Sequence, residues 1–356
     1  MTLIFIDHKF QYELERLFRN FFPPMELKLS TDRADAQGDF CLTEKSEFPE
    51  GVSLSMELVC DGKRYSMNRT LPAETPDKEQ EREMSVLLYK ALREYTGHDL
   101  PWGILTGVRP VKVLSKLTDA QALQSLLVSQ RKLAVARRIE QVQKPLAESI
   151  PANSFSLYVS IPFCPTRCSY CSFVSHSVDH AAARLEEYLA KMTEEMKQLA
   201  TISRHLGLIP DTIYFGGGTP TVLSAEQLKR LFAALECFDL SHIREFTVEA
   251  GRPDTITAEK LLAIKQAGAG RVSVNPQTMN DSVLKAIGRA HTSEQTEQAF
   301  LTAREVGFDV INMDLIAGLP TDDFDSFAAS LDTVCGLSPE NITVQPCAET
   351  RDAAVP

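Results

Sequence analysis

The sequence of 356 residues has one tryptophan, no excess of positive charge and, near its start, an apolar run of only four residues, LIFI. Such a run is too short for a signal peptide or a transmembrane helix. A formal net charge of −11 argues against general nucleic-acid binding, which needs a basic face. Eight irregularly spaced cysteines fit a reducing compartment better than a disulfide framework. We therefore expect a cytoplasmic protein that neither spans a membrane nor binds nucleic acid.

Length and composition predict two folded domains. A single hydrophobic core rarely grows beyond about 250–300 residues. An apolar content of 44% and a charged content of 24% are typical of globular proteins. We expect a smaller α+β domain at residues 1–145, a linker at 146–153 and a larger α/β domain at 154–346.

The first predicted domain shows mixed periodicity. Residues 2–7 predict a strand, while residues 9–22 and 85–95 carry apolar side chains at helical spacing. The turn-rich segment 101–110 contains Trp102, and we expect it to be a buried structural turn. A role in docking the domains or lining a site is the alternative.

From residue 154 onward, strand-like and helix-like segments alternate. The strand-like segments are short and almost continuously apolar, which is typical of buried parallel strands. Gly268 and Gly307 suit the ends of the intervening helices. Repeated βα units predict a parallel sheet with right-handed crossovers, either open or curled into a barrel. The predicted strands are 156–163, 211–216, 245–250, 271–276, 309–318 and 341–344.

Cys164, Cys168 and Cys171 form a Cys-x3-Cys-x2-Cys triplet after the first of these strands. A structural zinc site uses four protein ligands, and a ferredoxin cluster uses four cysteines. Three thiolates suit a [4Fe–4S] cluster that keeps one iron open for a substrate or cofactor. Zinc completed by His176 or His180, or a chance grouping without metal, is the alternative. The other cysteines stand singly in apolar stretches, and we expect them to be core residues without a redox role: Cys41, Cys60, Cys237, Cys335 and Cys347.

Further candidate residues follow the later strands. A glycine run, residues 216–218, lets the backbone approach a ligand closely. It could equally hold a phosphate, but no lysine follows as in a Walker loop and the GxGxxG spacing is absent. Glu249 ends the third strand and could simply cap a turn. Asp314 lies in an apolar run, where an unpaired charge is costly, so we expect it to have a partner and a functional role.

The cysteine triplet resembles the radical S-adenosylmethionine (SAM) superfamily. It is followed in order by FGGGTPT, FTVEAG, RVSVNPQTMND, IGRAHT and INMDLIAGLP. This order resembles the oxygen-independent coproporphyrinogen III oxidase/dehydrogenase family and its haem-chaperone relatives over residues 154–345. The resemblance implies a partial (β/α)6 barrel, a [4Fe–4S] cluster held by the three cysteines, and bound SAM.

Motif positions within the resemblance also imply the SAM contacts. The glycine run would lie against the methionine part of SAM. Glu249 would reach the ribose hydroxyls or the amino group, and Arg289 the carboxylate. Without the resemblance, Arg289 would be interpreted as a surface arginine. Tyr158 and Tyr170 would be interpreted as packing residues. The implied contacts are Tyr158, Tyr170, Gly217, Gly218, Thr219, Glu249, Gln277, Arg289 and Asp314.

The resemblance further implies a reaction. A donor such as flavodoxin or ferredoxin would reduce the cluster, SAM would be cleaved, and the 5′-deoxyadenosyl radical would take a hydrogen atom from a propionate of coproporphyrinogen III. Two oxidative decarboxylations would give protoporphyrinogen IX in haem biosynthesis. The tetra-acid substrate needs cations. Arg252 and Arg167 are candidates, with plain surface charges as the alternative.

Two features depart from the family pattern. Ser172 and Phe173 stand where well-studied oxidases carry a further cysteine, as in chaperone-like and extended branches. The N-terminal extension favours the extended dehydrogenase-like branch, with a haem chaperone or an inactive fragment as alternatives. The tail at 347–356 does not resemble the expected continuation. When the tail is written in one possible set of codons and read one base later, the encoded sequence resembles the expected continuation. We therefore expect a frameshift that removed a C-terminal domain.

Overall fold

The computed structural model describes residues 1–23, 25–107, 109–173 and 175–347, without the side chains of 179–183. The chain divides into two compact units, Met1–Ser149 and Ile150–Pro356. Each unit has a large hydrophobic core of its own. Apart from Cys347, the predicted aberrant tail lies outside the described residues.

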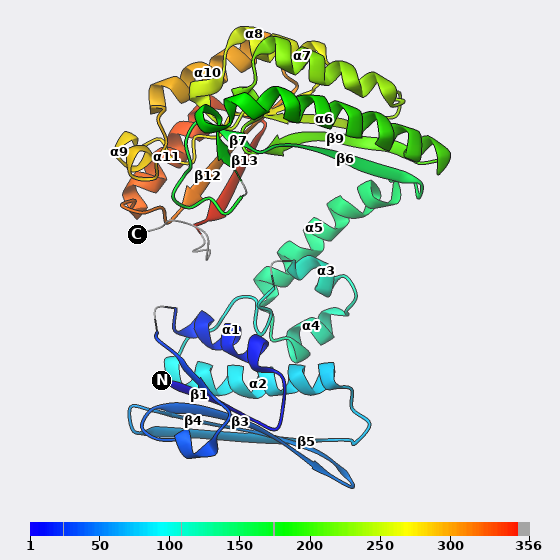
Figure 1. The fold of residues 1–356 in the computed structure, drawn as a ribbon. Helices are drawn as coiled ribbons and strands as arrows, with labels where there is room; N and C mark the ends of the chain where they lie inside the picture. Colours follow the sequence, from blue (N-terminus) through cyan, green and yellow to red (C-terminus); the bar gives the residue numbers. More distant parts are fainter. Residues whose placement is uncertain (24, 108, 174, 348–356) are drawn as a thin grey trace. The chain divides into compact units, whose positions relative to one another are not determined.

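The first unit contains a mixed five-stranded sheet in the order β2–β1–β3–β4–β5 (Figure 1). The strand predicted near the start is present as β1, which runs parallel to β2 and β3. β3, β4 and β5 form an antiparallel meander that the sequence analysis did not predict. The strands are β1 (Thr2–Ile6), β2 (Lys28–Ser30), β3 (Phe40–Phe48), β4 (Gly51–Cys60) and β5 (Lys63–Leu71).

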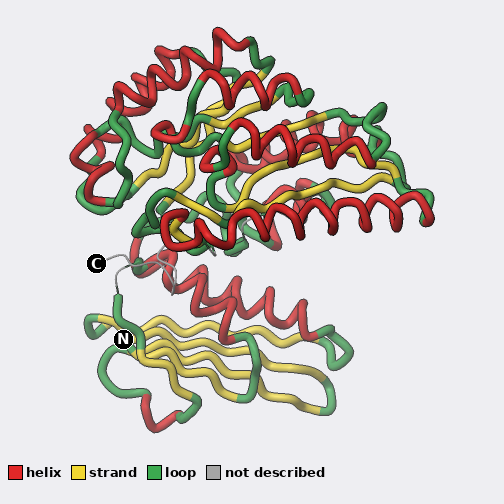
Figure 2. The backbone as a smooth tube through the Cα atoms, turned by 45° about the horizontal axis from the view of Figure 1, so that its top comes forward, coloured by secondary structure: helices red, strands yellow, loops and turns green. Residues whose placement is uncertain are grey.

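Two long helices, α1 (Gln11–Phe21) and α2 (Asp77–Thr96), lie over one face of this sheet (Figure 2). Both predicted helices are therefore present. β4 alternates buried and less buried residues because only one face of the sheet packs against the helices. The resulting architecture is the predicted α+β fold.

Three further helices complete the first unit around a small apolar cluster. Trp102 packs against this cluster, and the Lys132 ammonium lies 5.2 Å from its ring centroid. Trp102 therefore has a packing role within its own unit, as expected for a structural turn. The helices are α3 (Pro110–Leu114), α4 (Asp119–Ser125) and α5 (Gln130–Glu148).

The second unit is built on a six-stranded sheet in the order β6–β9–β10–β11–β12–β13. Every neighbouring pair of strands is parallel. Sequential order and a common direction confirm the predicted partial (β/α)6 barrel. The strands are β6 (Ser154–Ile161), β9 (Ile209–Gly217), β10 (Glu245–Glu249), β11 (Arg271–Ser273), β12 (Val310–Ala317) and β13 (Asn341–Pro346).

Helices connect these strands, and α6, α7, α8 and α10 lie along one side of the sheet (Figure 1). Capping boxes begin α7 and α10, and Gly307 ends α10 in the left-handed conformation, as predicted. The sheet brings the carboxyl ends of its parallel strands to one edge, where the candidate residues lie. The helices are α6 (Val178–His205), α7 (Ala225–Ala233), α8 (Ala258–Gln266), α9 (Asp281–Ala286), α10 (Ser293–Val306) and α11 (Phe324–Leu337).

The isolated cysteines differ in exposure. Cys41 and Cys60 are buried, and burial raises the pKa of the Cys41 thiol to about 12. Cys237 and Cys347 are half-buried, whereas Cys335 is exposed. The expectation of a core position is therefore wrong for Cys335, because this residue lies on a solvent-facing part of α11.

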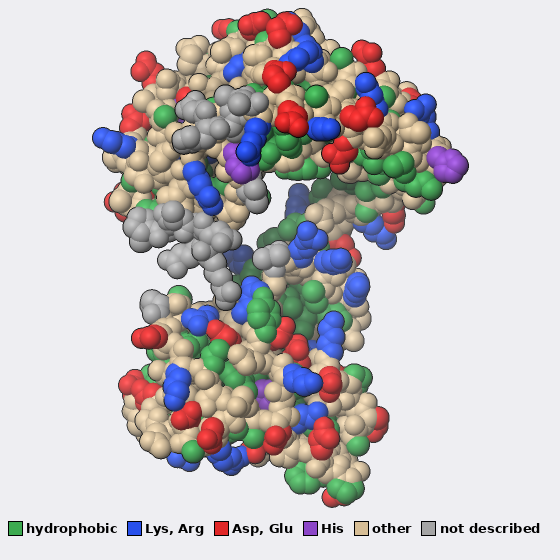
Figure 3. All heavy atoms as spheres, viewed as in Figure 1, with side chains coloured by type: hydrophobic (Ala, Val, Ile, Leu, Met, Phe, Trp, Pro, Cys, Tyr) green, Lys and Arg blue, Asp and Glu red, His purple; other side chains and the backbone are tan. Residues whose placement is uncertain are grey.

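Within the described residues, no helix has the length and apolarity required to cross a membrane. Acidic and basic side chains are mixed over the face shown in Figure 3.

Candidate functional site

The three cysteines lie in a loop, residues 164–171, that follows β6 and is called the cysteine loop below. The two-residue strand β7 (Phe163–Cys164) pairs in parallel with β8 (His176–Ser177) and closes the base of this loop. The Cys171 amide donates to the Cys168 carbonyl at 3.2 Å, which forms a turn between these two residues. All three thiols are half-buried, and burial raises the pKa of Cys164.

The cysteine loop also contacts the turn that follows α9. The Ser169 amide donates to the Ile287 carbonyl at 3.1 Å. Tyr170 packs against an apolar cluster that includes Val283 and Leu284 of α9. Tyr170 therefore anchors the loop by packing, which was the reading of this residue without the resemblance, and its contact with a cofactor stays a prediction.

The geometry of the thiols tests the zinc alternative. Two sulfurs on one zinc ion lie at most about 4.6 Å apart, because each Zn–S bond is about 2.3 Å. Among the described residues, one group of at least three His, Cys, Asp or Glu side chains has all ligand atoms within 4.8 Å of one another: Asp39, Cys60 and Asp61 in the first unit. The cysteine loop forms no such group with His176, and the His180 side chain lies outside the description.

The glycine run packs closely against the backbone that enters the cysteine loop. Gly217 has a φ of +102°, and a Cβ there would lie 2.6 Å from Ser160 Oγ. A Cβ on Gly218 would lie 2.6 Å from the Phe163 carbonyl oxygen. Thr219 donates its amide to this carbonyl at 2.8 Å, and its hydroxyl lies 3.4 Å from the sulfur at the start of the loop. Close backbone packing thus requires these glycines, and their contact with SAM stays a prediction.

Two tyrosines and two carboxylates form a second part of the site. The Tyr214 hydroxyl donates to Glu249 at the end of β10. The Tyr158 ring stacks on the Tyr214 ring, with centroids 5.6 Å apart and planes 10° apart. Asp314 is half-buried and accepts a hydrogen bond from Asn312 Nδ2 at 2.7 Å, so the partner expected for this carboxylate is present.

The electrostatics of this part favour a positively charged ligand. Burial and the negative charge of Asp314 raise the pKa of Glu249, although the hydrogen bond from Tyr214 opposes them. Burial and Glu249 likewise raise the pKa of Tyr214. A cation next to the two carboxylates would relieve their repulsion. Tyr158 is 58% exposed, so its ring is accessible beside them.

Gln277 and Arg289 occupy strained or buried positions near the same edge. Gln277 has a φ of +67°, which costs free energy for a residue with a side chain and is found preferentially at functional sites. Its amide donates to the Asp314 carbonyl at 2.9 Å. Arg289 is buried and donates through Nη1 to the carbonyls of Gly251 (3.1 Å) and Asn275 (2.7 Å). Arg289 is therefore not a surface arginine, which was the interpretation of this residue without the resemblance.

Residues 158–334 match the family model described as the radical SAM superfamily. A Bacillus subtilis protein named oxygen-independent coproporphyrinogen-III oxidase-like protein HemZ is 34% identical over 95% of this chain and 70% of its own length. The chain belongs to the radical SAM superfamily, within its coproporphyrinogen oxidase (HemN) family. The B. subtilis heme chaperone HemW is 39% identical over 53% of this chain and 49% of its own length. The solved structure of the Escherichia coli coproporphyrinogen III oxidase HemN covers 61% of this chain and 52% of its own, at 29% identity and a TM-score of 0.49.

Membership of the radical SAM superfamily implies a [4Fe–4S] cluster and SAM, and the buried polar atoms fit a polar cofactor. Ser169 Oγ, Asn275 Oδ1 and Arg289 Nε are buried without a hydrogen-bond partner. Such atoms are costly unless a bound polar group or water satisfies them. Ser169 belongs to the cysteine loop. Asn275 and Arg289 belong to two other segments, which are joined by the hydrogen bond from Arg289 to the Asn275 carbonyl. The residues present therefore fit a polar ligand beside the thiols.

The two arginines that were candidates for substrate binding in this radical SAM protein differ in exposure. Arg252 is 3% exposed and donates to Thr166 and Asp254, so its guanidinium is not available to a substrate carboxylate. The prediction was wrong because the sequence does not show that the residue turns inward. Arg167 is exposed on the cysteine loop and remains a candidate.

Sequence reasoning missed Tyr214, Asn275 and His291. A signal existed for Tyr214, because it stands two residues before Gly216 and therefore shares its face of β9. For the other two, the sequence carries no such periodic signal, because both lie in irregular segments beyond the strands.

Proposed function

We propose that this radical SAM protein holds a [4Fe–4S] cluster through Cys164, Cys168 and Cys171 and binds SAM beside it. When bound, these groups supply one-electron reductive cleavage of SAM and hydrogen-atom abstraction from a substrate. The protein contributes binding, orientation and exclusion of water. The observation that carries the proposal is the three-thiol loop at the carboxyl edge of a parallel sheet.

In this proposal the second part of the site, with its two tyrosines and two carboxylates, orients the cofactor. Glu249 and Asp314 attract the positive charges of SAM, and the Tyr214 hydroxyl holds the Glu249 carboxylate in one orientation. The exposed ring of Tyr158 offers a surface on which adenine stacks. Arg289 provides a buried cation for the carboxylate of SAM, since its Nε has no protein partner.

We propose coproporphyrinogen III as the substrate, with oxidative decarboxylation of two propionates to vinyl groups. The alignment with the HemZ protein supports this choice because it covers 95% of this chain, including the first unit. The net charge of −11 does not attract an acidic macrocycle. Local cations must therefore bind it, and Arg167 on the cysteine loop is one candidate. An external one-electron donor, such as flavodoxin or ferredoxin, reduces the cluster, and an external one-electron acceptor takes the electron that each substrate radical releases together with CO2.

A haem chaperone is the second candidate function. Two observations favour it: 39% identity to the HemW chaperone over half of this chain, and Ser172 and Phe173 where oxidases of the family carry a further cysteine. Such a protein would keep the cluster and bind haem tightly. It would form no vinyl product from coproporphyrinogen III.

One anaerobic assay separates these functions. Protein reconstituted with iron and sulfide is mixed with dithionite, SAM and coproporphyrinogen III, then analysed for 5′-deoxyadenosine and decarboxylated porphyrin. Cys168→Ala should lose both products and most of the bound iron. Cys335→Ala, an exposed cysteine on α11, is the matched control and should behave like the unmodified chain.

The outcomes assign the function. Both products support the dehydrogenase, whereas tight haem binding without decarboxylation supports the chaperone. SAM cleavage without either of these would indicate an inactive fragment. Unmodified protein that takes up zinc but no iron, or a Cys168→Ala variant that still cleaves SAM, would contradict the cluster assignment.

A further inference from the structure

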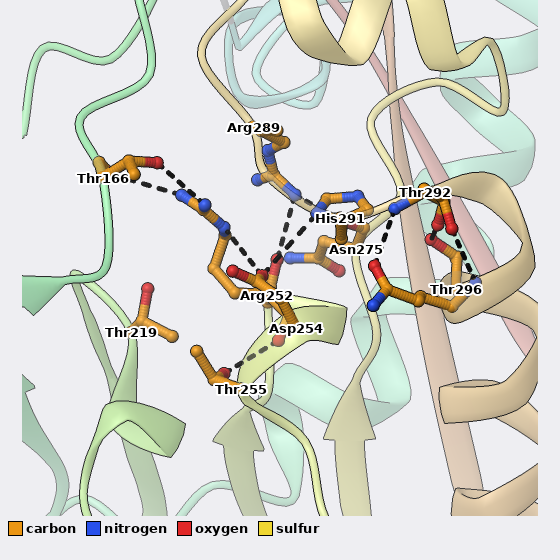
Figure 4. Close-up of polar contacts among 12 residues, drawn as sticks. Thr166, Thr219, Arg252, Asp254, Thr255, Asn275, Arg289, His291, Thr292 and Thr296 are labelled. Atoms are coloured by element: carbon orange, nitrogen blue, oxygen red, sulfur yellow. Dashed lines mark hydrogen bonds and ion pairs between the residues drawn. The ribbon is translucent and has the colours of Figure 1, made fainter.

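Arg252 connects the cysteine loop to the sheet through a fully buried guanidinium. It follows β10 directly and is only 3% exposed. Its Nη2 donates to Thr166 Oγ1 at 2.9 Å, and its Nη1 donates to the Thr166 carbonyl at 3.2 Å (Figure 4). The same Nη1 lies 3.7 Å from Cys168 Sγ, within the range of a hydrogen bond to sulfur. One side chain thus contacts both the backbone of the loop and one of its thiols.

The loop residue that Arg252 binds is anchored a second time. The Thr166 hydroxyl donates to the Gly288 carbonyl at 2.7 Å. Arg289, the next residue, donates back to the Gly251 carbonyl beside Arg252 at 3.1 Å. Three segments that are distant in sequence are therefore closed into a ring of hydrogen bonds. Removing the Arg252 guanidinium would open this ring at the cysteine loop.

The charged groups around Arg252 show how its guanidinium could interact with a Cys168 thiolate. Its Nε lies 3.3 Å from Asp254 Oδ1, and His291 Nδ1 lies 3.7 Å from the same oxygen. His291 is buried, and burial lowers its pKa, so it adds no positive charge at neutral pH. Among the described residues, the anionic neighbours of the buried guanidinium are therefore the Asp254 carboxylate and thiols of the cysteine loop, of which Cys168 is within hydrogen-bonding range. A hydrogen-bonded cation stabilises a thiolate and the more negative, reduced state of a cluster.

We propose that Arg252 is a positioning residue that holds the cysteine loop closed and, through its contact with Cys168, raises the reduction potential of the bound cluster. The inference rests on the proposed function, since it takes Cys168 as a cluster ligand. It differs from the substrate-binding role expected from the sequence, because the guanidinium donates inward to the protein.

The test compares Arg252→Gln with Arg252→Lys in the full chain, after anaerobic reconstitution. For Arg252→Gln we expect lower iron content, and at least tenfold faster amide hydrogen exchange in residues 164–171. We also expect about a tenfold lower ratio of reduced to oxidised cluster at a fixed electrode potential, equivalent to about 59 mV for a one-electron couple. Arg252→Lys keeps the charge but not the fork, so it should recover part of the potential without restoring the exchange protection. Arg230→Gln, an exposed arginine on α7, is the control and should change none of these quantities.

The results separate this inference from the proposed function. Unmodified protein that binds no iron would overturn the proposed function itself. Arg252→Gln with unchanged iron, potential and exchange would overturn only the positioning role. Should Arg252→Gln fail to fold, Thr166→Val decides, because it removes the hydroxyl between Arg252 and Gly288 while keeping the side-chain shape. Faster exchange in the loop of this variant supports the inference, and unchanged exchange rejects it.

Discussion

The two sheets of this protein differ in where they place polar side chains. The sheet of the first unit ends in an antiparallel meander. Among the described residues of that unit, three of the four buried polar side chains belong to α2: Gln80, Glu83 and Ser85. The sheet of the second unit is wholly parallel, and several of its strands end close to buried polar residues. Parallel strands bring all their carboxyl ends to one edge, whereas an antiparallel meander alternates its ends. Direction of pairing, rather than sheet size, therefore decides where a site can be assembled.

The largest effect expected is on the stability of the first unit. Leu58→Ala in β4 removes a fully buried side chain and should lower the free energy of unfolding of that unit by about 2–5 kcal/mol. Denaturation followed by the fluorescence of Trp102, the only tryptophan, measures it. SAM affinity should stay unchanged. A parallel loss of SAM binding would break the comparison, because it would show that the first unit contributes to the site.

The next effect concerns two glutamates, the half-buried Glu249 and the buried Glu83. Glu249→Gln should weaken SAM binding about 10- to 100-fold, because a charge-assisted hydrogen bond contributes about 1.5–3 kcal/mol. Equilibrium dialysis with the reconstituted protein measures this affinity. Glu83→Gln, in the first unit, alters a carboxylate that Arg69 contacts and should leave the affinity unchanged. Equal SAM affinities of the two variants would show that Glu249 does not contact SAM.

A smaller effect should follow from changing a tyrosine that donates a hydrogen bond to a carboxylate. Tyr214→Phe removes the hydrogen bond that lowers the pKa of Glu249, so this pKa should rise further. Because the ionised carboxylate binds SAM, affinity should fall on acidification at a higher pH than in the unmodified protein. At neutral pH we expect about a fivefold weaker affinity, the value of one hydrogen bond.

Tyr95→Phe is the matched control for this pH profile. Tyr95 donates to Asp61 at 2.6 Å in the first unit, in the same kind of pair. Its removal should leave both the SAM affinity and its pH dependence as they are. A shift of equal size in the two variants would assign the effect to general destabilisation.

The smallest effect is expected at the amino-terminal edge of the parallel sheet. Asp211 accepts two hydrogen bonds from Arg244 at 2.6 Å, and these hold the pKa of Asp211 below its ordinary value. Asp211→Asn should lower the free energy of unfolding by at most about 1 kcal/mol at pH 7. The difference from the unmodified protein should vanish as the pH falls below about 4, because protonation of Asp211 removes the same interaction. Altered SAM binding would contradict a site confined to the opposite edge.

Periodicity predicted most of the second unit. The six strands were expected near their observed positions, because buried parallel strands are short apolar runs that stand out between amphipathic helices. The meander of the first unit was not predicted, since β5 is largely exposed and the second half of β3 carries charged residues. A half-exposed strand has a weaker sequence signal than a fully buried one.

The sequence by itself determined the spacing of the three cysteines, the alternation of strands and helices, and hence the family and the partial barrel. These features are local, and so they can be read along the chain. Only the tertiary structure decided that Arg252 turns inward to the cysteine loop, that Tyr214 binds Glu249 and that Cys335 faces solvent. Each of these depends on which distant segment lies beside the residue, because hydrogen bonds and burial follow proximity in space rather than order in the sequence.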